Sequence, residues 1–348
     1  MSISQTTSGK TASQFAIENR LQIEHLLSTS QSSVNAAKIS NDAIHGLTQT
    51  PKSLPPLFFY DDIGSELFEQ ICDLPEYYVT RTETEILQKY AGEIAHLTGA
   101  SEIVELGSGS SKKTRILLDA YYQLGHPMHY VPIDVSAGIL ESSARELLID
   151  YPSLQIQGLV GTYELALERL KATHLPSRTI CFIGSTLGNL SPQECDRFFT
   201  QIADALQPGE YFLLGIDLQK PKHLLEAAYN DSQGVTAAFN LNMLHHLNWR
   251  FDGNFNPEMF EHWAFYNEHL HQIEMHLRSL QSQTVELRHL NLTIELAAGE
   301  TIFTEISRKF DLNNIQQELQ TQGLLTLKVF TDPNQGVGLL LCQRQSSK

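Results

Sequence analysis

The sequence predicts an α/β fold in which a doubly wound, mostly parallel sheet is joined to a second, α+β domain. Three observations support this prediction. Strand-like apolar segments alternate with helical patterns from Glu102 to about residue 219. The alternation fails between Lys220 and about Phe303, where two helical segments precede three strand-like ones. The chain then resumes the α/β pattern with one helix and a terminal hairpin, "LLTLKVFTD", "PNQG" and "VGLLLCQ".

The α/β part begins with the strand "EIVELG", a Gly/Ser turn and a helix that ends at Gly125. Later strands are expected at "YVPIDV", "LQIQGLVG", "TICFIG" and "YFLLGIDL", and repeated strand–helix units require a mostly parallel sheet. One helix start is well defined, because Ser191 suits the N-cap, Pro192 the first helical position and Glu194 a capping box. Pro132 has no N–H to donate inside a sheet, so we expect a bulge or a local edge there.

The N-terminal part of the chain divides at a proline-rich segment. Residues 1–14 are small and polar, and we expect them to be disordered. The apolar residues between Phe15 and Leu27 are spaced like one helix. After "TPKSLPP", an aromatic-rich segment contains two helical patterns separated around Pro75. We expect this segment to form a cap over a site.

The composition argues against several classes of partner. The 348 residues carry a formal net charge of -16, with a pI of about 5.3. Such a chain has no basic face for phosphates, so we expect neither nucleic acid nor membrane as a partner. The four cysteines lie far apart without a CxxC pair, which predicts neither a zinc site nor disulfides. No apolar run approaches the ~20 residues of a membrane span and no signal peptide is recognisable, so we expect a cytoplasmic protein. We also expect a monomer.

The first strand–helix turn has the composition of a ligand-binding loop. In "ELGSGSSKKT", Gly107 and Gly109 allow the backbone to approach a ligand where helix N–H groups also point. Lys112 stands where a dinucleotide-binding loop has its third glycine, which disfavours an NAD-type ligand. Asp134 ends the next strand, where a carboxylate can accept hydrogen bonds from both ribose hydroxyls. The alternative is that Asp134 only caps the helix that begins near Ser136.

A second candidate pair lies in the strand-like segment "TIFTEIS". Glu305 and Ser307 are two residues apart, so their side chains leave the same face and can meet one polar ligand. A carboxylate and a hydroxyl together suit an imidazole or an ammonium group, although such a pair is more commonly a solvated face. The histidines between His245 and His276 form no recognised metal motif, and we predict no metal.

A terminal antiparallel hairpin on a parallel sheet resembles the class I methyltransferases, whose methyl donor is S-adenosylmethionine. Several segments together resemble one family more specifically, the histidine Nα-methyltransferases of ergothioneine biosynthesis. The resemblance extends from about Asn41 to the C-terminus. The segments that carry it are "SLPPLFFYDDIGSELFEQICDLPEYYVTRTETEIL", "ELGSGSSKKTRILLDA", "FIGSTLGNLSP", "YNDSQGVTAAFNLNML" and "FTEISRKF".

This resemblance implies two domains, one that binds S-adenosylmethionine and one that binds the substrate. The first is built from the α/β units and the terminal hairpin, and the second from the N-terminal cap and the insertion. We therefore expect the substrate-binding domain in residues 1–80 and 220–305. The S-adenosylmethionine-binding methyltransferase domain is expected in residues 81–219, with a return to it in residues 306–348.

The resemblance also implies the residues that bind the cofactor. Gly107 and Lys113 match the family's cofactor loop, and Asp134 matches its ribose ligand. Thr162 and Tyr163 occupy the position that contacts the adenine. The family usually has an aspartate before the aromatic residue there, so Thr162 is a departure from the pattern. A threonine hydroxyl can also bond to adenine, so the departure bears on cofactor affinity and not on cofactor identity.

On the substrate side, the resemblance points to free L-histidine. Related members that act on other amino acids lack the Glu-x-Ser pair, and Glu305 would accept a hydrogen bond from an imidazole N–H, with Ser307 beside it. Tyr60 lines the site and is the candidate for orienting the amine, although the proton could equally leave through water. The other substrate-binding matches are Asn189 and Tyr229 at the carboxylate, Tyr77 near the imidazole, and Met275 in the lining.

The predicted reaction is the transfer of three methyl groups in succession from S-adenosylmethionine to the α-amine of L-histidine, which gives hercynine. In-line attack by a neutral amine depends on positioning and desolvation, so we assign no essential general base. Two alternatives stay open: an N-methyltransferase of another amino acid, and a non-catalytic S-adenosylmethionine-binding module. The retained set of substrate residues argues against both.

Overall fold

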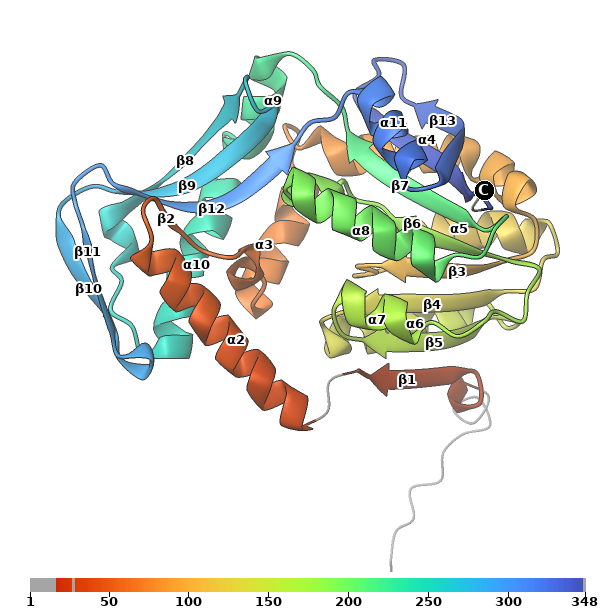
Figure 1. The fold of residues 1–348 in the computed structure, drawn as a ribbon, viewed down its shortest axis with the longest axis horizontal. Coiled ribbons are helices and arrows are strands. Elements are labelled where there is room, and N and C mark those ends of the chain that lie inside the picture. Colours follow the sequence, from red (N-terminus) through yellow and green to blue (C-terminus); the bar gives the residue numbers. More distant parts are fainter. Residues whose placement is uncertain (1–16, 27–28, 347–348) are drawn as a thin grey trace, which may run out of the picture.

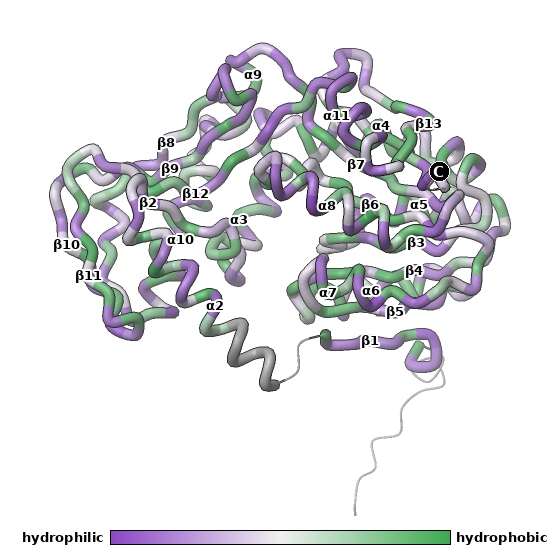
Figure 2. Tube along the Cα trace, viewed as in Figure 1, coloured by the Kyte–Doolittle hydropathy of each residue, from purple (hydrophilic) through white to green (hydrophobic). Residues whose placement is uncertain are grey.

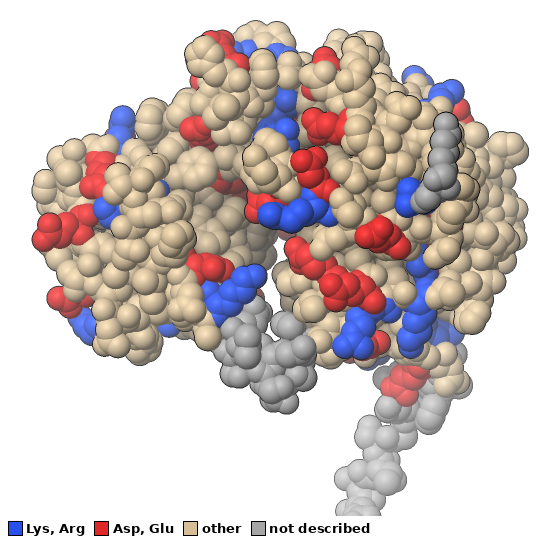
Figure 3. Space-filling view, viewed as in Figure 1, with Lys and Arg blue, Asp and Glu red and all other residues tan. Residues whose placement is uncertain are grey.

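The structure, a computed structural model, describes residues 17–26 and 29–346 of the chain. Figure 1 shows two lobes side by side. One, the α/β lobe, holds a large sheet covered by helices; the other, the mixed lobe, holds two smaller sheets and further helices. The space-filling view is hollowed between the lobes, with acidic and basic side chains at the border (Figure 3).

An eight-stranded sheet forms the centre of the α/β lobe. Its strands, in spatial order, are β1 (Leu21–His25), β5 (Gln155–Val160), β4 (His129–Asp134), β3 (Ser101–Leu106), β6 (Ser177–Phe182), β7 (Tyr211–Asp217), β14 (Val337–Arg344) and β13 (Leu324–Thr331). In this spatial order, neighbouring strands from β1 as far as β7 pair in parallel, whereas β14 is antiparallel to both β7 and β13. The expected parallel sheet with a terminal antiparallel hairpin is therefore confirmed.

Helices cover both faces of this sheet, as a buried parallel sheet requires. One face packs on α4 (Tyr78–Thr98), α5 (Lys112–Gln123) and α6 (Ala137–Asp150), and the other on α7 (Tyr163–Arg169), α8 (Pro192–Ala205) and α11 (Leu312–Thr321). The capping box at the start of α8 is present as expected: Ser191 accepts from the Glu194 N–H, and the Glu194 carboxylate accepts from the Ser191 N–H at 2.8 Å.

The mixed lobe is built from the N-terminal cap and the insertion together. Its four-stranded sheet has the order β2 (Lys52–Ser53), β12 (Thr301–Arg308), β9 (Gln272–Ser279) and β8 (Phe260–Asn267), and a separate hairpin pairs β10 (Gln283–Leu287) with β11 (Leu292–Leu296). Its helices are α2 (Thr29–Thr48), α3 (Asp62–Asp73), α9 (Lys222–Tyr229) and α10 (Val235–Phe251). One apolar cluster unites them, including Leu47, Phe59, Met243, Ile273 and Leu287. The cap and the insertion therefore share a core.

The prediction of a helix between Phe15 and Leu27 is wrong for most of the residues of this segment that the structure describes. Leu21–His25 form β1, which pairs with β5 at the edge of the large sheet. Thus β1 belongs to the α/β lobe, although residues 1–80 are expected in the substrate-binding domain. The tube in Figure 2 is largely hydrophilic along β1, as an edge strand allows, so hydropathy gave little strand signal. The polar start, residues 1–14, lies outside the described residues.

Pro132 is accommodated inside the sheet without a bulge. The register of β4 on β5 is the same at Tyr130–Ile156 and at Ile133–Leu159, but Val131 and Pro132, in between, form no pair with β5. On its other side Pro132 stands opposite a residue of β3. A local gap in one ladder therefore absorbs the missing N–H. Among the described residues, no helix is long and apolar enough to cross a membrane.

Candidate active site

The glycine-rich loop connects β3 to α5 and folds against the end of β4. Gly107 and Gly109 have φ values of 72° and 48°, which glycine adopts without steric cost. The Gly109 N–H donates to Asp134 Oδ2 at 2.9 Å, and the Ser136 N–H donates to Oδ1 at 2.9 Å. Ser136 itself, not Asp134, is the N-cap of α6. The carboxylate of Asp134 thus ties the loop to β4 and keeps lone pairs for a ligand.

Tyr163 reaches across to the same loop from the start of α7. A Cβ added at Gly107 would lie 3.0 Å from the Tyr163 hydroxyl oxygen, so this position needs glycine for space as well as for conformation. The Tyr163 ring packs edge-on against Phe182 of β6, with the ring centroids 5.5 Å apart. Thr162 is the N-cap of α7 and makes no side-chain cap hydrogen bond. The residues expected at the ribose and the adenine therefore lie around one loop.

Lys113 is held by a buried carboxylate that sequence reasoning missed. Its Nζ pairs with Glu83 of α4, whose side chain is fully buried, and Glu83 also accepts from the Gly184 N–H at 2.8 and 2.9 Å. Nearby, Ser108 Oγ and Ser185 Oγ are buried and have no hydrogen-bond partner in the described part of the chain. Because they follow the carboxyl ends of β3 and β6, these hydroxyls fit a polar ligand bound at the switch point of the sheet.

Glu105 supports the loop from below. The hydroxyls of Thr114 and Tyr130 donate to its carboxylate, and Tyr130 OH lies 3.2 Å from Ser111 Oγ. Burial raises the pKa of Glu105 to about 7, although the two hydroxyl donors oppose the shift. The sequence signal that could have identified Glu105 is its position, because it is an acidic residue near the end of an apolar strand, just before the glycines of the loop.

The substrate residues expected on different segments meet where the two lobes join. Glu305 and Ser307 lie on β12, and Tyr229 is the last residue of α9. The Tyr229 hydroxyl donates to Ser307 Oγ at 2.7 Å. Tyr77, at the N-cap of α4, places its ring edge-on to that of Tyr229, with centroids 6.4 Å apart. The structure thus brings together four residues from three parts of the sequence.

Glu305 is the charged group of this cluster. The Asn189 amide, which donates to the β12 main chain at 2.8 Å, lies close to it. Burial raises the pKa of Glu305 to about 7, although the charge of Lys309 and the nearby Asn189 oppose the shift. Tyr60 lies at the mouth of the site, with 49% of its surface exposed, and burial of its covered side together with the Glu305 charge raises its pKa. Met275 stands opposite Glu305 in the β9–β12 ladder.

A buried lysine behind these residues was not predicted. Lys309 Nζ lies 2.9 Å from Asp217 Oδ2, 2.7 Å from Ser307 Oγ and 3.2 Å from the Tyr229 hydroxyl oxygen. The sequence signal was the period of two, because Glu305 and Ser307 share one strand face and Lys309 follows at the same spacing, one residue after β12 ends. A lysine just after a strand is normally solvated, so its burial depends on the carboxylate that ends β7.

Asp217 is the centre of this ionic cluster. It also pairs with Lys220 and accepts from the Tyr78 hydroxyl at 3.0 and 2.8 Å. Burial alone would raise the pKa of Asp217, but Lys309 and Lys220 hold it below its usual value. Two lysines against one carboxylate leave a formal charge of +1 beside Tyr229, which favours an anionic group of a ligand.

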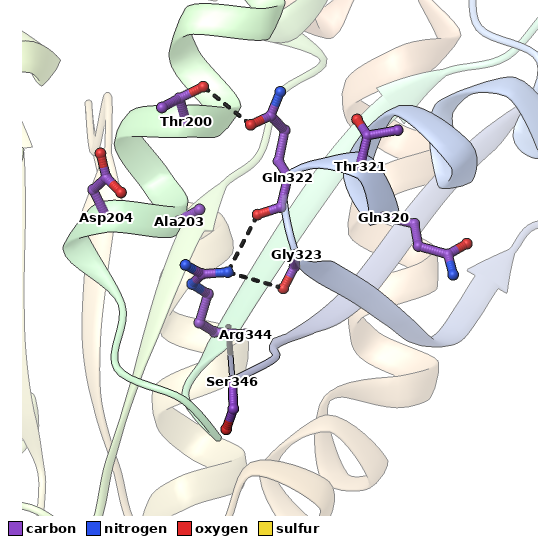
Figure 4. A pocket seen from close by; sticks show the side chains of 9 residues that line it. All are labelled: Thr200, Ala203, Asp204, Gln320, Thr321, Gln322, Gly323, Arg344 and Ser346. Atoms are coloured by element: carbon purple, nitrogen blue, oxygen red, sulfur yellow. Dashed lines mark hydrogen bonds between the residues drawn. The ribbon is translucent and has the colours of Figure 1, made fainter. Parts of the chain in front are cut away.

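A pocket shown in Figure 4 lies away from this junction, between α8, α11 and the end of β14. Arg344 Nη1 donates there to the main-chain carbonyls of Gln322 at 3.3 Å and Gly323 at 3.5 Å, and the Thr200 hydroxyl donates to the Gln322 side chain at 3.1 Å. Its lining contains none of the residues expected to bind cofactor or substrate. Within the described ranges, no group of three or more His, Cys, Asp or Glu side chains could hold a metal ion.

Comparisons with known proteins identify the family of this chain. A family model described as histidine-specific methyltransferase, SAM-dependent, matches residues 39–344. Over 309 residues the chain is 44% identical to the histidine N-alpha-methyltransferase of Mycolicibacterium smegmatis, covering 89% of this chain and 96% of that protein. The protein of the same name from Mycobacterium tuberculosis is 42% identical, with 88% and 95% covered. A 4-dimethylallyltryptophan N-methyltransferase of Claviceps purpurea is 29% identical, with 83% and 90% covered. The chain therefore belongs to the S-adenosylmethionine-dependent, histidine-specific methyltransferase family.

Proposed function

We propose that this enzyme transfers three methyl groups in succession from S-adenosylmethionine to the α-amine of free L-histidine, giving hercynine for ergothioneine biosynthesis. The observation that carries the proposal is the grouping of Glu305 and Ser307 with Tyr229 and Tyr77 at the junction of the lobes. A carboxylate that accepts and a hydroxyl that donates match the two nitrogens of a neutral imidazole. Relatives named as histidine N-alpha-methyltransferases support the same substrate.

The residues around the glycine-rich loop fit the methyl donor. When bound, S-adenosylmethionine supplies an electrophilic methyl group on its sulfonium sulfur. Asp134 would accept from the ribose hydroxyls, while Thr162 and Tyr163 would contact the adenine. Gly107 gives the backbone room to approach the ligand, and Lys113 lines the loop. The buried, unpartnered hydroxyls beside this loop support a polar ligand at this position.

On the substrate side, the chain's task is to hold the amine in one orientation. Asn189 and Tyr229 would bind the carboxylate, while Glu305 and Ser307 would bind the ring, so the α-amine between them has a fixed direction. Alignment of two reactants can supply ~7 to 11 kcal/mol of the barrier. Tyr60 is proposed to orient the amine as a neutral phenol, because its raised pKa keeps the proton on it. The amine proton then leaves to solvent, without an essential general base.

The domain roles follow from the same proposal. Residues 81–219 and 306–348 would form the domain that binds the methyl donor, although Asn189 and Ser307 within them would contact histidine. Residues 220–305 with the cap would form the histidine-binding domain, β1 being the exception within residues 1–80. We also propose a cytoplasmic monomer without nucleic-acid or membrane partners. The net charge of -16 supports the absence of polyanionic partners, and a site assembled within one chain supports the monomer.

Replacement of Glu305 by alanine tests the proposed ring contact. The Glu305→Ala variant should raise the histidine KM by about 10- to 100-fold, because a buried imidazole N–H loses a charged acceptor. The dissociation constant of S-adenosylmethionine, measured by calorimetry, should change by less than about twofold, because the cofactor does not use this contact. Glu295→Ala, at an exposed glutamate of β11, is the matched control. An unchanged histidine KM in Glu305→Ala would remove the basis of the proposal.

A further inference from the structure

Lys309 is a buried cation to which the reaction described above gives no role. Its side chain has no accessible surface, and its three close oxygens are Asp217 Oδ2 at 2.9 Å, Ser307 Oγ at 2.7 Å and Tyr229 OH at 3.2 Å. An ammonium group has three protons to donate and no lone pair to accept. These three contacts use all of its protons. Lys309 therefore acts on a substrate only through the residues that it holds.

The direction of these hydrogen bonds follows from the chemistry of the ammonium group. Because Lys309 can only donate, Ser307 Oγ and the Tyr229 oxygen must accept from it. Ser307 Oγ also accepts from the Tyr229 hydroxyl at 2.7 Å, which occupies both of its lone pairs. The only hydrogen-bonding capacity left to Ser307 is its own proton.

We infer that Lys309 fixes Ser307 as a hydrogen-bond donor and thereby makes the pocket selective for a ring with an unprotonated nitrogen. The inference rests on the proposed function and concerns how histidine is distinguished from other amino acids. Ser307 donates to the bare nitrogen of the imidazole, while Glu305 accepts from the N–H of the other nitrogen. The two contacts together select one neutral tautomer in one orientation. Lys309 is a positioning residue in this scheme.

The same lysine also favours the carboxylate of the substrate beside Tyr229. With Lys220 and Asp217, Lys309 leaves a formal charge of +1 beside Tyr229, which attracts the carboxylate while the Tyr229 proton stays on Ser307 Oγ. This carboxylate contact is common to all α-amino acids. Only the Ser307 contact depends on the ring, so the two roles of Lys309 can be separated by comparing ligands.

Lys220 provides a matched control, because it pairs with the same carboxylate from another side. It bonds to Asp217, to the Tyr78 hydroxyl at 2.7 Å and to the Leu218 carbonyl at 2.8 Å. Its bonds in the described structure do not include the hydroxyls of the substrate site. Lys309→Met and Lys220→Met each leave Asp217 with one cation, so each removes one charge and keeps a neutral buried pair.

The experiment compares histidine with β-(2-thienyl)alanine, whose ring has neither an accepting nitrogen nor an N–H. The measured quantity is the inhibition constant of the analogue divided by the KM of histidine. In Lys309→Met the histidine KM should rise by about tenfold or more while the analogue's constant changes by less than about threefold, so the ratio falls. A weaker carboxylate contact affects both ligands and cancels from the ratio. Lys220→Met should keep the wild-type ratio.

Ser307→Ala should lower the ratio as Lys309→Met does. The Ser307→Ala/Lys309→Met double variant should lower the ratio little further, because both changes remove the same contact. If Lys309→Met does not fold, Asp217→Asn/Lys220→Met/Lys309→Met removes all three charges of the cluster and should show the same fall. An unchanged ratio in the variant tested, or an equal fall in Lys220→Met, would overturn the inference. A wild-type enzyme that did not methylate histidine would instead contradict the proposed function itself.

Discussion

At the residue scale, the ionised form of Glu305 that would bind the substrate ring is also the form that lowers the stability of the unliganded protein. Burial raises its pKa from an ordinary value of 4.5 to about 7. A carboxyl group with a raised folded-state pKa stabilises the folded protein while it is protonated, and this contribution is lost as the pH rises through about 7. The ionised form, which would accept from the imidazole N–H, is therefore the form that destabilises the unliganded protein.

Glu305→Gln should reverse that cost in a pH-dependent way. Glutamine does not titrate, so the variant should gain stability over the wild type at pH 8, by about 2 kcal/mol after allowing for partial solvent contact. At pH 5, where the wild-type carboxyl is mostly protonated in the folded state, the gain should be much smaller. Thermal melting of both proteins at the two pH values measures the difference. A melting-temperature gain of the same size at both pH values would show that Glu305 does not titrate as described.

Single residues also show what the sequence could and could not predict. Glu305 and Ser307 were identifiable because alternation along a strand puts them on one face. Lys309 continues the same alternation, yet nothing local indicates its burial, which depends on Asp217 far away in the sequence. Burial of a charge requires a partner, and a partner from another strand is set by the fold and not by spacing.

At the scale of elements, β1 pairs with β5, the strand that leads to Thr162 and Tyr163, but it lies outside residues 39–344, which the family model matches. Just after β1, the Leu26 N–H donates to the Val160 carbonyl at 2.9 Å. A Cβ added at Gly161 would lie 3.1 Å from Leu26, so the leucine covers the residue that precedes Thr162 and Tyr163. The strand therefore supports the segment proposed to contact the adenine.

Leu26→Ala tests this support. We expect the dissociation constant of S-adenosylmethionine to rise by about three- to tenfold, because a cavity beside residues 160–163 loosens the adenine contacts. Leu21→Ala, at the other end of the same strand, should have a smaller effect. The histidine KM at saturating S-adenosylmethionine should change little in either variant. Equal cofactor affinities in the wild type and Leu26→Ala would show that β1 does not contribute to cofactor binding.

Elements with local signals were predicted well. The capping box of α8 and the terminal hairpin depend on residues a few positions apart, and both are present. In contrast, β1 forms only because the edge of β5 is free to pair with it, and its five residues carry a weak pattern of their own. Pro132 was recognised as a conflict, but only the actual register shows that a two-residue gap in the β4–β5 ladder resolves it.

The whole molecule places the proposed reaction between two lobes with separate cores. The chain crosses from the α/β lobe after β7 and returns after β12, and at this place Leu218 and Phe310 form a parallel bridge. The buried cluster around Asp217 lies at the same crossing. Sequence order alone predicted an insertion and a cap, and only the family resemblance implied that they build one domain; the structure shows the apolar core that they share. This shared core is what brings Tyr60 and Tyr77 to the residues of the insertion.

The measurement that tests the central claim most directly is mass spectrometry of reactions containing the purified protein, S-adenosylmethionine and each of the twenty amino acids singly. The account predicts mono-, di- and trimethylated histidine, with no methylated product from any other amino acid. Methylation of a different amino acid would contradict the roles of Glu305 and Ser307 while leaving the fold and the cofactor loop intact. The absence of any product, with S-adenosylmethionine still bound, would contradict the assignment of a methyltransferase activity.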